Sequence, residues 1–417
     1  MASIQLLHAR EILDSRGNPT LEVTCELSGG FVGTAGVPSG ASTGVHEALE
    51  LRDNDEARYN GLGVLQAIGH IEHEIQKAVS GKEFTQQTLD EALIALDGTE
   101  HKTRLGANAI LGVSLAFAHA SAREAGRELF EHIGGLTGNT HFLLPEPFFN
   151  IINGGKHADS GLDIQEYLIG PVGLSSVHEK VRAGEEVISA LKKILLERGL
   201  AVSVGDEGGF APKLASNEEA LILIEEAIRN AGYTFDQIKI GIDVAASSFY
   251  TNGFYNVKIK GEQRQVDSHG LIDWYAELVT KHPIISIEDG LSEDDFDGFA
   301  LLNQELGGRI SIVGDDLTVT NKQRIQMAFE KKAINAVIIK PNQIGTLSET
   351  IEAILLTKQY GWIPFVSHRS GETMDTTIAD LSVGLSCGRI KSGSLTRGER
   401  VAKYNRLMEI EDILASK

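Results

Sequence analysis

The sequence predicts an α/β fold, in which a C-terminal TIM-like (β/α)8 barrel of parallel strands follows a smaller α+β domain. Three observations predict it. Short apolar runs end at or just before a charged residue, with helical patterns between most of them. From Glu288 the landmarks fall at positions 315, 340, 368 and 391, at intervals of 27, 25, 28 and 23 residues, and each interval suits one strand, one helix and two short loops. The chain of 417 residues has room for a barrel of about 250 residues and a second domain.

The first part of the chain is expected to form the α+β domain. Residues 21–27 and 31–37 have strand-like sequences. A helix is expected to begin at Thr88, because Thr88 and Glu91 have the spacing of a capping box. Residues 105–125 are rich in Ala, Leu and Gly, which predicts a buried helix.

Glycine and proline mark the end of this domain. Gly134 and Gly135 are followed by Gly138, Pro145 and Pro147, and this composition argues against a helix or strand there. We therefore expect two domains, residues 1–135 and residues 136–417.

The second domain is expected to hold the barrel. Residues 217–230 and 347–359 carry apolar side chains at helical spacing. In a barrel of parallel strands the C-terminal strand ends meet on one face, so charged residues at those ends converge. The expected strands are residues 238–243, 283–288, 310–315, 337–340, 363–366 and 389–391.

The chain is acidic, with 38 Lys and Arg against 58 Asp and Glu and a formal net charge of −20. We expect it to repel nucleic acid and anionic lipid, although it can still bind a small anion in one cleft. Cys25 and Cys387 are too few for a disulfide framework or a cysteine-built zinc site. The first residues lack the apolar stretch of a signal peptide, and no segment approaches the roughly 20 apolar residues of a membrane span. A cytoplasmic protein is expected, and a secondary cell-surface or secreted pool stays open.

Three carboxylates, Asp243, Glu288 and Asp315, follow strands of the expected barrel. A single Asp or Glu after a strand is usually a turn or helix-cap residue. Three on one face favour a divalent cation instead. Magnesium prefers oxygen ligands, and no His pair accompanies these residues at the spacing that zinc would need.

Two lysines end strands on the same face. Lys340 closes an apolar run, where a solvated lysine would be out of place. A buried ammonium near a second cation, such as Lys391, loses part of its proton affinity, and a lysine then becomes a general base near neutral pH. The alternative is that each lysine forms a structural ion pair with one of the carboxylates.

Three loops add candidate residues. Residues 38–44 form a hydroxyl- and glycine-rich loop that can close over a phosphate or metal, or serve as a plain turn. Arg369 follows an expected strand, where it can bind phosphate in a bidentate way or cap a helix. Glu207 lies among glycines, where the backbone can bring a carboxyl group to a substrate; an ordinary acidic turn is the alternative.

These residues belong to motifs that together resemble the enolase family over essentially the whole chain. The resemblance implies the reversible dehydration of 2-phosphoglycerate to phosphoenolpyruvate in glycolysis, on a barrel of the enolase type. It also implies two magnesium ions per active site and a homodimer or an assembly of dimers. The motifs lie at residues 13–19, 39–44, 105–111, 153–157, 165–166, 205–209, 286–289, 314–320, 340–346, 367–373 and 390–391.

The resemblance also implies a role for each site residue. Lys340 matches the base that removes the proton at C2, and Glu207 matches the acid that assists loss of the C3 hydroxyl. Lys340 must then be neutral and Glu207 protonated, and we expect their surroundings to shift the two pKa values in that sense. The implied metal ligands are Asp243, Glu288 and Asp315 for the first magnesium and Ser42 for the second. The implied substrate contacts are His157, Gln165, Glu166, Glu288, Asp315, Lys340, His368, Arg369, Ser370 and Lys391, of which His157 and Glu166 also count as catalytic.

The chain departs from the family pattern at Ser160-Gly161, Ser248, Gly290 and Met374, in loops that border the expected site. Two alternatives stay open. One is another enzyme of the superfamily that abstracts an α-proton, and the phosphate-binding residues argue against it. The other is a non-catalytic binding or structural protein, and an intact base, acid and metal set argues against that.

Overall fold

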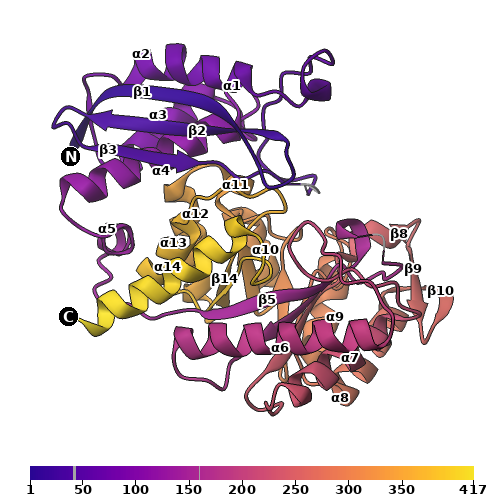
Figure 1. Ribbon diagram of the computed structural model, residues 1–417. Coiled ribbons are helices and arrows are strands. Elements are labelled where there is room, and N and C mark those ends of the chain that lie inside the picture. Colours follow the sequence, from indigo (N-terminus) through magenta and orange to yellow (C-terminus); the bar gives the residue numbers. More distant parts are fainter. Residues whose placement is uncertain (41–43, 159) are drawn as a thin grey trace.

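The computed structural model describes residues 1–40, 44–158 and 160–417, which form an N-terminal domain and a closed barrel (Figure 1). The N-terminal domain lies against one end of the barrel. Its helices α3 (Gln86–Asp97) and α4 (Ala107–Glu124) contact α12 (Leu347–Gln359), and α4 also contacts α11 (Pro341–Ile344). The α/β fold with two domains is therefore confirmed.

The N-terminal domain is built on an antiparallel sheet with the strand order β3-β2-β1-β4. Alternate residues face the helices, and the buried pairs Leu7 with Cys25 and Val23 with Ala35 lie in register across the strands. The expected strands at 21–27 and 31–37 are present, but β1 was not expected. The strands are β1 (Ala2–Leu13), β2 (Pro19–Leu27), β3 (Val32–Gly36) and β4 (Glu83–Phe84), and the remaining helices are α1 (Leu65–Gly69), α2 (Gln76–Val79) and α5 (Leu129–Thr137).

Gly33 sets the close contact between β3 and α4. A Cβ atom at this position would lie 2.2 Å from both Ala116 O and Ala120 N, which are backbone atoms of α4. We expect Gly33→Ala to lower the free energy of unfolding by about 3 kcal/mol, because the helix must shift to make room. Urea unfolding measures this. Gly69→Ala is the control, since nothing lies within 4 Å of its Cβ position; equal midpoints for the two variants would contradict the close contact.

The N-cap of helix α3 is Thr85, three residues before the expected N-cap at Thr88. The Thr85 hydroxyl accepts from the Thr88 amide at 3.2 Å, and the Thr88 hydroxyl accepts from the Thr85 amide at 2.9 Å. The expected capping box at Thr88 is therefore wrong. Thr88 occupies the third helical position, where a capping box usually has glutamate or glutamine. The Thr88 and Glu91 spacing therefore placed the expected N-cap about one turn too far along the chain.

The expectation that Gly134 and Gly135 exclude a helix is also wrong, because both lie inside α5. The absence of a side chain serves packing here. A Cβ at Gly134 would lie 2.6 Å from Phe142 and 2.9 Å from Gly384 O in α13 (Thr377–Gly384). The helix ends four residues later at Gly138, which has the left-handed φ of +74° that glycine tolerates.

The barrel closes in the strand order β11-β12-β13-β14-β15-β5-β6-β7. Each of the six strands expected from the apolar runs is present within a residue or two. The barrel interior is filled by Phe148, Leu168, Val313, Ala336, Ile338 and Phe365. The strands are β5 (Glu146–Asn153), β6 (Glu166–Gly170), β7 (Lys239–Asp243), β11 (Ile284–Glu288), β12 (Ser311–Gly314), β13 (Ala336–Ile339), β14 (Ile363–Ser367) and β15 (Arg389–Lys391).

One strand departs from the expected parallel arrangement. β6 runs antiparallel to both neighbours, β5 and β7. Its first residue, Glu166, lies opposite Asn153 at the end of β5 and Asp243 at the end of β7. The reversal puts the start of β6 on the face where the other strands end, so Glu166 reaches the same site as the strand-end charges.

Helices surround the barrel, and a small antiparallel sheet of β8, β9 and β10 projects from one side (Figure 1). The helices expected at 217–230 and 347–359 are α7 and α12, and both match at each end. The outer helices are α6 (Val177–Glu197), α7 (Asn217–Asn230), α8 (Ser268–Lys281), α9 (Phe296–Leu306), α10 (Lys322–Lys331) and α14 (Gly398–Ala415), and the projecting strands are β8 (Tyr250–Thr251), β9 (Phe254–Ile259) and β10 (Glu262–Val266).

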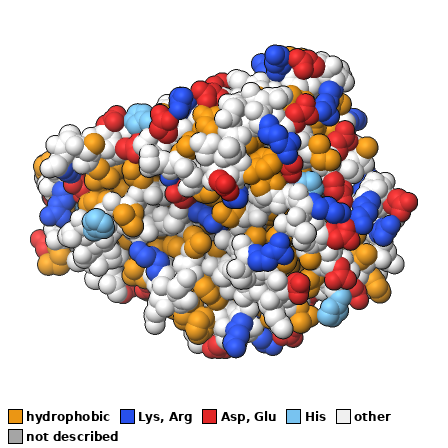
Figure 2. All heavy atoms as spheres, turned by 90° about the horizontal axis from the view of Figure 1, so that it is seen from below, with side chains coloured by type: hydrophobic (Ala, Val, Ile, Leu, Met, Phe, Trp, Pro, Cys, Tyr) orange, Lys and Arg blue, Asp and Glu red, His pale blue; other side chains and the backbone are white. Residues whose placement is uncertain are grey.

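The face of the molecule seen from below carries side chains of both signs. Figure 2 shows basic and acidic side chains interspersed with apolar ones on the face seen from below. In the part of the chain that the structure describes, no helix is both long and apolar enough to cross a membrane.

Candidate active site

The strand ends enclose a polar pocket on the side of the barrel that faces the N-terminal domain. Its lining includes most of the residues that the sequence analysis singled out, together with four that it did not: Ala245, Asp289, Asp316 and Ser367. Glu288 is buried beneath it. Ser42 lies outside the described residues. The expected residues in the lining are His157, Gln165, Glu166, Glu207, Asp243, Asp315, Lys340, His368, Arg369, Ser370 and Lys391.

Lys391 lies at the centre of three carboxylates. Its ammonium is 2.7 Å from Glu288, 3.1 Å from Glu166 and 3.5 Å from Asp243, and it is 2% exposed. Burial lowers the pKa of Lys391, but these carboxylates outweigh burial and raise it well above its usual value. Burial and the neighbouring Asp243 likewise raise the pKa of Glu288 well above its usual value. The single positive charge of Lys391 therefore does not compensate all the negative charge of these three carboxylates.

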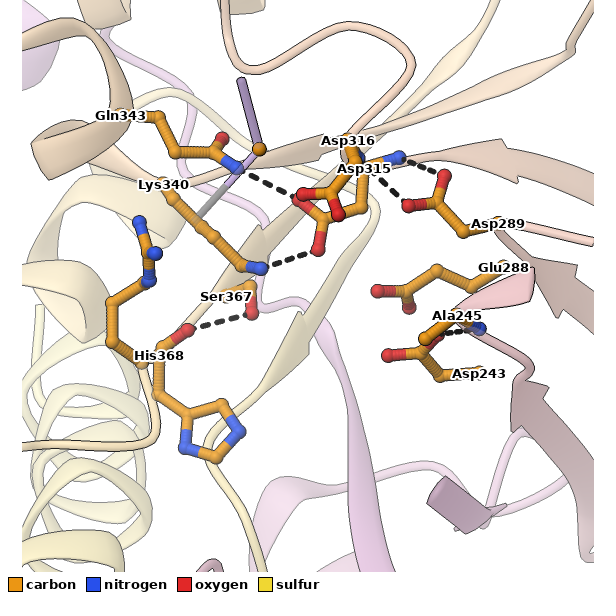
Figure 3. A network of polar contacts seen from close by, with 12 residues as sticks. Asp243, Ala245, Glu288, Asp289, Asp315, Asp316, Lys340, Gln343, Ser367 and His368 are labelled. Atoms are coloured by element: carbon orange, nitrogen blue, oxygen red, sulfur yellow. Dashed lines mark hydrogen bonds and ion pairs between the residues drawn. The ribbon is translucent and has the colours of Figure 1, made fainter. Parts of the chain in front are cut away.

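Asp315 is held from both sides. One carboxylate oxygen forms an ion pair with Lys340, and the other accepts from the carboxamide of Gln343 at 2.9 Å (Figure 3). Burial lowers the pKa of Lys340, but Asp315 outweighs burial and the net pKa is raised. The contact with Asp315 thus favours the ammonium form of Lys340. The neutral lysine expected at the reacting, magnesium-loaded step stays a prediction.

Asp289 is a site residue that sequence reasoning missed. Its carboxylate accepts from the backbone amides of Asp315 and Asp316, each at 2.8 Å, and so fixes the turn that carries Asp315 (Figure 3). Burial raises the pKa of Asp289 well above its usual value, and burial next to Asp315 raises the pKa of Asp316 to about 8. The signal was available, since Asp289 follows Glu288 directly and Asp316 follows Asp315.

Glu207 and Glu166 form a second acidic group in the pocket lining. His157 Nδ1 lies 3.6 Å from Glu207 and 3.7 Å from Glu166, and His368 Nε2 lies 3.5 Å from Glu207. Asn150, on β5, donates to Glu207 at 3.0 Å. The turn expected around Glu207 is present, and Gly208 in it has a φ of +87°.

The two carboxyls differ in proton affinity. Burial raises the pKa of both. In Glu207 the imidazoles of His157 and His368 outweigh burial and lower the net pKa, whereas the negative charge of Glu207 adds to burial in Glu166 and raises it further. The two pKa values are therefore shifted in opposite directions. The protonated Glu207 expected at the reacting step stays a prediction.

A buried arginine fixes the state of His368. Burial lowers the pKa of His368 to about 4, so its imidazole is neutral at pH 7. Arg400, at the start of α14, lies 2.5 Å from its Nδ1 and also donates to the carbonyls of Arg369 and Ser370, each at 2.6 Å. Because arginine only donates, Nδ1 must accept and the hydrogen sits on Nε2, facing Glu207. His368 therefore stabilises Glu207 as a hydrogen-bond donor and not as a cation.

Arg369 occupies the side of the pocket nearest the N-terminal domain. Its guanidinium donates to Glu47 and to Asn342, both at 2.9 Å. A Cβ atom on Gly40 would lie 2.0 Å from the same guanidinium, so the start of the 38–44 loop presses against it. The site is thus built from both domains.

The departures from the family pattern lie away from the pocket lining. Ser248 and Met374 are exposed. Gly290 comes directly after Glu288 and Asp289 in the sequence, and its carbonyl accepts a hydrogen bond from the hydroxyl of Tyr275 at 2.8 Å.

The donors on this face fit a hard divalent cation. They are buried carboxylates with no thiol among them, which is the chemistry that magnesium prefers. Oxygen atoms of Asp289, Asp315 and Asp316 all lie within 4.8 Å of one another. Of the expected trio, Asp243 and Glu288 contact the Lys391 ammonium and Asp315 contacts the Lys340 ammonium.

Known proteins match the chain along almost its full length. The family model for the enolase N-terminal domain matches residues 4–133, and that for the enolase C-terminal TIM barrel domain matches residues 141–417. The chain belongs to the enolase family. An enolase from Rubrobacter xylanophilus is 52% identical over 416 residues, which cover 99% of this chain and 96% of that protein. Enolases are phosphopyruvate hydratases, so family membership makes this chain a lyase of glycolysis that depends on a divalent metal.

Proposed function

We propose that this strand-end pocket carries out the reversible dehydration of 2-phosphoglycerate to phosphoenolpyruvate. The observation that supports it best is that one pocket holds both kinds of group that the reaction needs. Its lining includes Lys340 beside Asp315, and it also includes the Glu166 and Glu207 pair. A base and an acid can therefore reach the same substrate.

Asp243, Glu288 and Asp315 are the proposed ligands of the first magnesium, and the resemblance adds Ser42 for the second. The three acids are buried at the ends of the neighbouring strands β7, β11 and β12, or one residue beyond. When bound, magnesium would neutralise Asp315 and the substrate carboxylate, which lowers the pKa of Lys340 and favours a second negative charge on the substrate.

Lys340 is the proposed base at C2. Its ammonium pairs with Asp315, and its half-buried side chain belongs to the pocket lining. Loss of the C3 hydroxyl requires a proton, and burial beside Glu207 raises the pKa of Glu166, which favours a protonated carboxyl in this pair. We propose that a proton of the pair passes to the leaving hydroxyl through Glu207, which takes it from Glu166.

The remaining residues hold the substrate. Arg369 and Ser370 would bind its phosphate, since a guanidinium presents parallel donors to phosphate oxygens. Lys391 would lie on the substrate carboxylate, where it stabilises the charge that develops after C2 loses its proton. His157 and Gln165, with Glu166, would lie around the substrate and its leaving group, and His368 would contact the substrate; all four belong to the pocket lining.

A cytoplasmic homodimer is the assembly we propose, from family membership. Cys25 and Cys387 are both buried free thiols, which suits a reducing compartment. We also propose that the domain border lies near residue 135.

A direct assay tests the proposed reaction. We expect purified protein to form phosphoenolpyruvate from 2-phosphoglycerate, followed by the ultraviolet absorbance of the enol product, only when magnesium is present. Excess chelator should abolish the signal and added magnesium should restore it. Absence of product from folded, magnesium-loaded protein would overturn the proposal.

A further inference from the structure

The turn between β12 and α10 has an unusual backbone. Val319 and Thr320 are consecutive β-branched residues with φ values of +44° and +57°. Side chains branched at Cβ rarely adopt this left-handed region, because they collide with the backbone there. Both residues are almost completely buried, at 1% and 0% exposed. Such a conformation persists only where the surroundings hold it, so the contacts of Thr320 are of interest.

The Thr320 hydroxyl makes two hydrogen bonds inside the site. It accepts from the backbone amide of Lys340 at 2.9 Å and donates to Gln343 Oε1 at 2.7 Å. A hydroxyl carries a single hydrogen, and the amide of Lys340 can only donate. The hydrogen must therefore point at Gln343, which fixes the oxygen of that carboxamide toward Thr320.

The other end of the Gln343 carboxamide faces two acids. Its nitrogen donates to Asp315 Oδ1 at 2.9 Å and lies 3.4 Å from Glu47 Oε1 in the N-terminal domain. The backbone carbonyl of Gln343 accepts from the Ala48 amide at 2.8 Å. Figure 3 shows the Gln343 side chain reaching Asp315 alongside Lys340. Gln343 is 1% exposed, so water does not compete for these bonds.

We propose that Thr320 and Gln343 are positioning residues that hold the Asp315 carboxylate in the orientation in which it binds a divalent cation. The inference rests on the proposed role of Asp315 as a metal ligand. Ligand carboxylates need outer hydrogen bonds to stay oriented, and loss of one typically weakens metal binding 10- to 100-fold. Three consecutive hydrogen bonds connect the Lys340 amide, the Thr320 hydroxyl, the Gln343 carboxamide and the Asp315 carboxylate. They fix the position of the proposed base relative to the proposed metal ligand.

Calorimetric titration of magnesium into metal-stripped protein, without substrate, tests this. Thr320→Val keeps the size and branching of the side chain and removes the hydroxyl, and Gln343→Leu removes the carboxamide. Each is expected to weaken magnesium binding about 10- to 100-fold. Thr320→Ser keeps the hydroxyl and should bind magnesium as the parent does. The double variant Thr320→Val with Gln343→Leu should lose little more than either alone, because both act through the same bond.

The outcomes separate this inference from the one it rests on. Parent affinity in folded Thr320→Val and Gln343→Leu overturns the positioning role and leaves Asp315 as a ligand. Equal losses in Thr320→Val and Thr320→Ser also overturn it, since the hydroxyl would then not be the cause. If the parent itself binds no magnesium, the proposed metal site fails and the inference with it. Thermal unfolding of each metal-free variant establishes whether it is folded. If Thr320→Val is not folded, the titration of Gln343→Leu tests the proposal.

Discussion

Replacing Lys340 with alanine is expected to lower the turnover number by about 10⁴-fold, at the upper end of what a general base contributes. The half-buried Lys340 side chain lines the pocket and its ammonium contacts Asp315. Among the described lysines the pocket lining also includes Lys391, but that ammonium is engaged by three acids. Steady-state kinetics at saturating magnesium and substrate measure the change. Circular dichroism establishes that the variant is folded.

Two companion variants separate proton abstraction from loss of charge. Lys340→Arg keeps a cation beside Asp315 but cannot act as a base near neutral pH, because arginine stays protonated. We expect it to be nearly as inactive as Lys340→Ala. Lys322→Ala removes an exposed lysine that forms an ion pair with Glu352 at 2.7 Å and does not belong to the described pocket lining, so full activity is expected. Substantial turnover by Lys340→Arg would contradict the assignment of Lys340 as the base.

Local sequence patterns predicted most of the barrel, for physical reasons. Strands buried on both faces must be apolar throughout, and helices of the outer layer must carry an apolar stripe, so the runs at 283–288 and 337–340 and the helix at 347–359 could be recognised. The direction of a strand leaves no comparable trace. The antiparallel course of β6 was missed because an apolar strand has the same composition whichever way it runs.

The site residues were recognisable by type, whereas their protonation was not. Strand-end position and the family motifs pointed to Lys340, Glu207 and Asp315, and the structure brings them to one pocket. The directions of their pKa shifts depend on contacts a few ångströms long. Lys340 meets Asp315, and Glu207 meets two imidazoles. Such contacts join residues far apart in the chain, so spacing along the sequence carries no information about them.

Replacing Lys391 with methionine is expected to lower the turnover number by about 10³-fold and to destabilise the metal-free protein by about 3–5 kcal/mol. Methionine fills much of the space of lysine but leaves Glu288, Glu166 and Asp243 facing one another without a cation. Lys180→Met is the matched control. Lys180 is also buried, but it pairs with the single, partly exposed carboxylate of Glu146, so the loss of stability should be much smaller.

The pH dependence of this loss distinguishes acid crowding from a simple packing defect. Without the ammonium, the pKa values of Glu166 and Glu288, already raised, must rise further. A carboxyl whose pKa is higher in the folded than in the unfolded state favours folding below its unfolded pKa of about 4.3, and this advantage disappears as the pH rises through the folded pKa. The deficit of Lys391→Met in urea unfolding should therefore be largest near pH 8 and shrink toward pH 5.

Added magnesium should also reduce this deficit, because a divalent cation supplies the missing charge. A deficit that stays constant with pH and magnesium would show that the three acids do not depend on Lys391 for their charge balance.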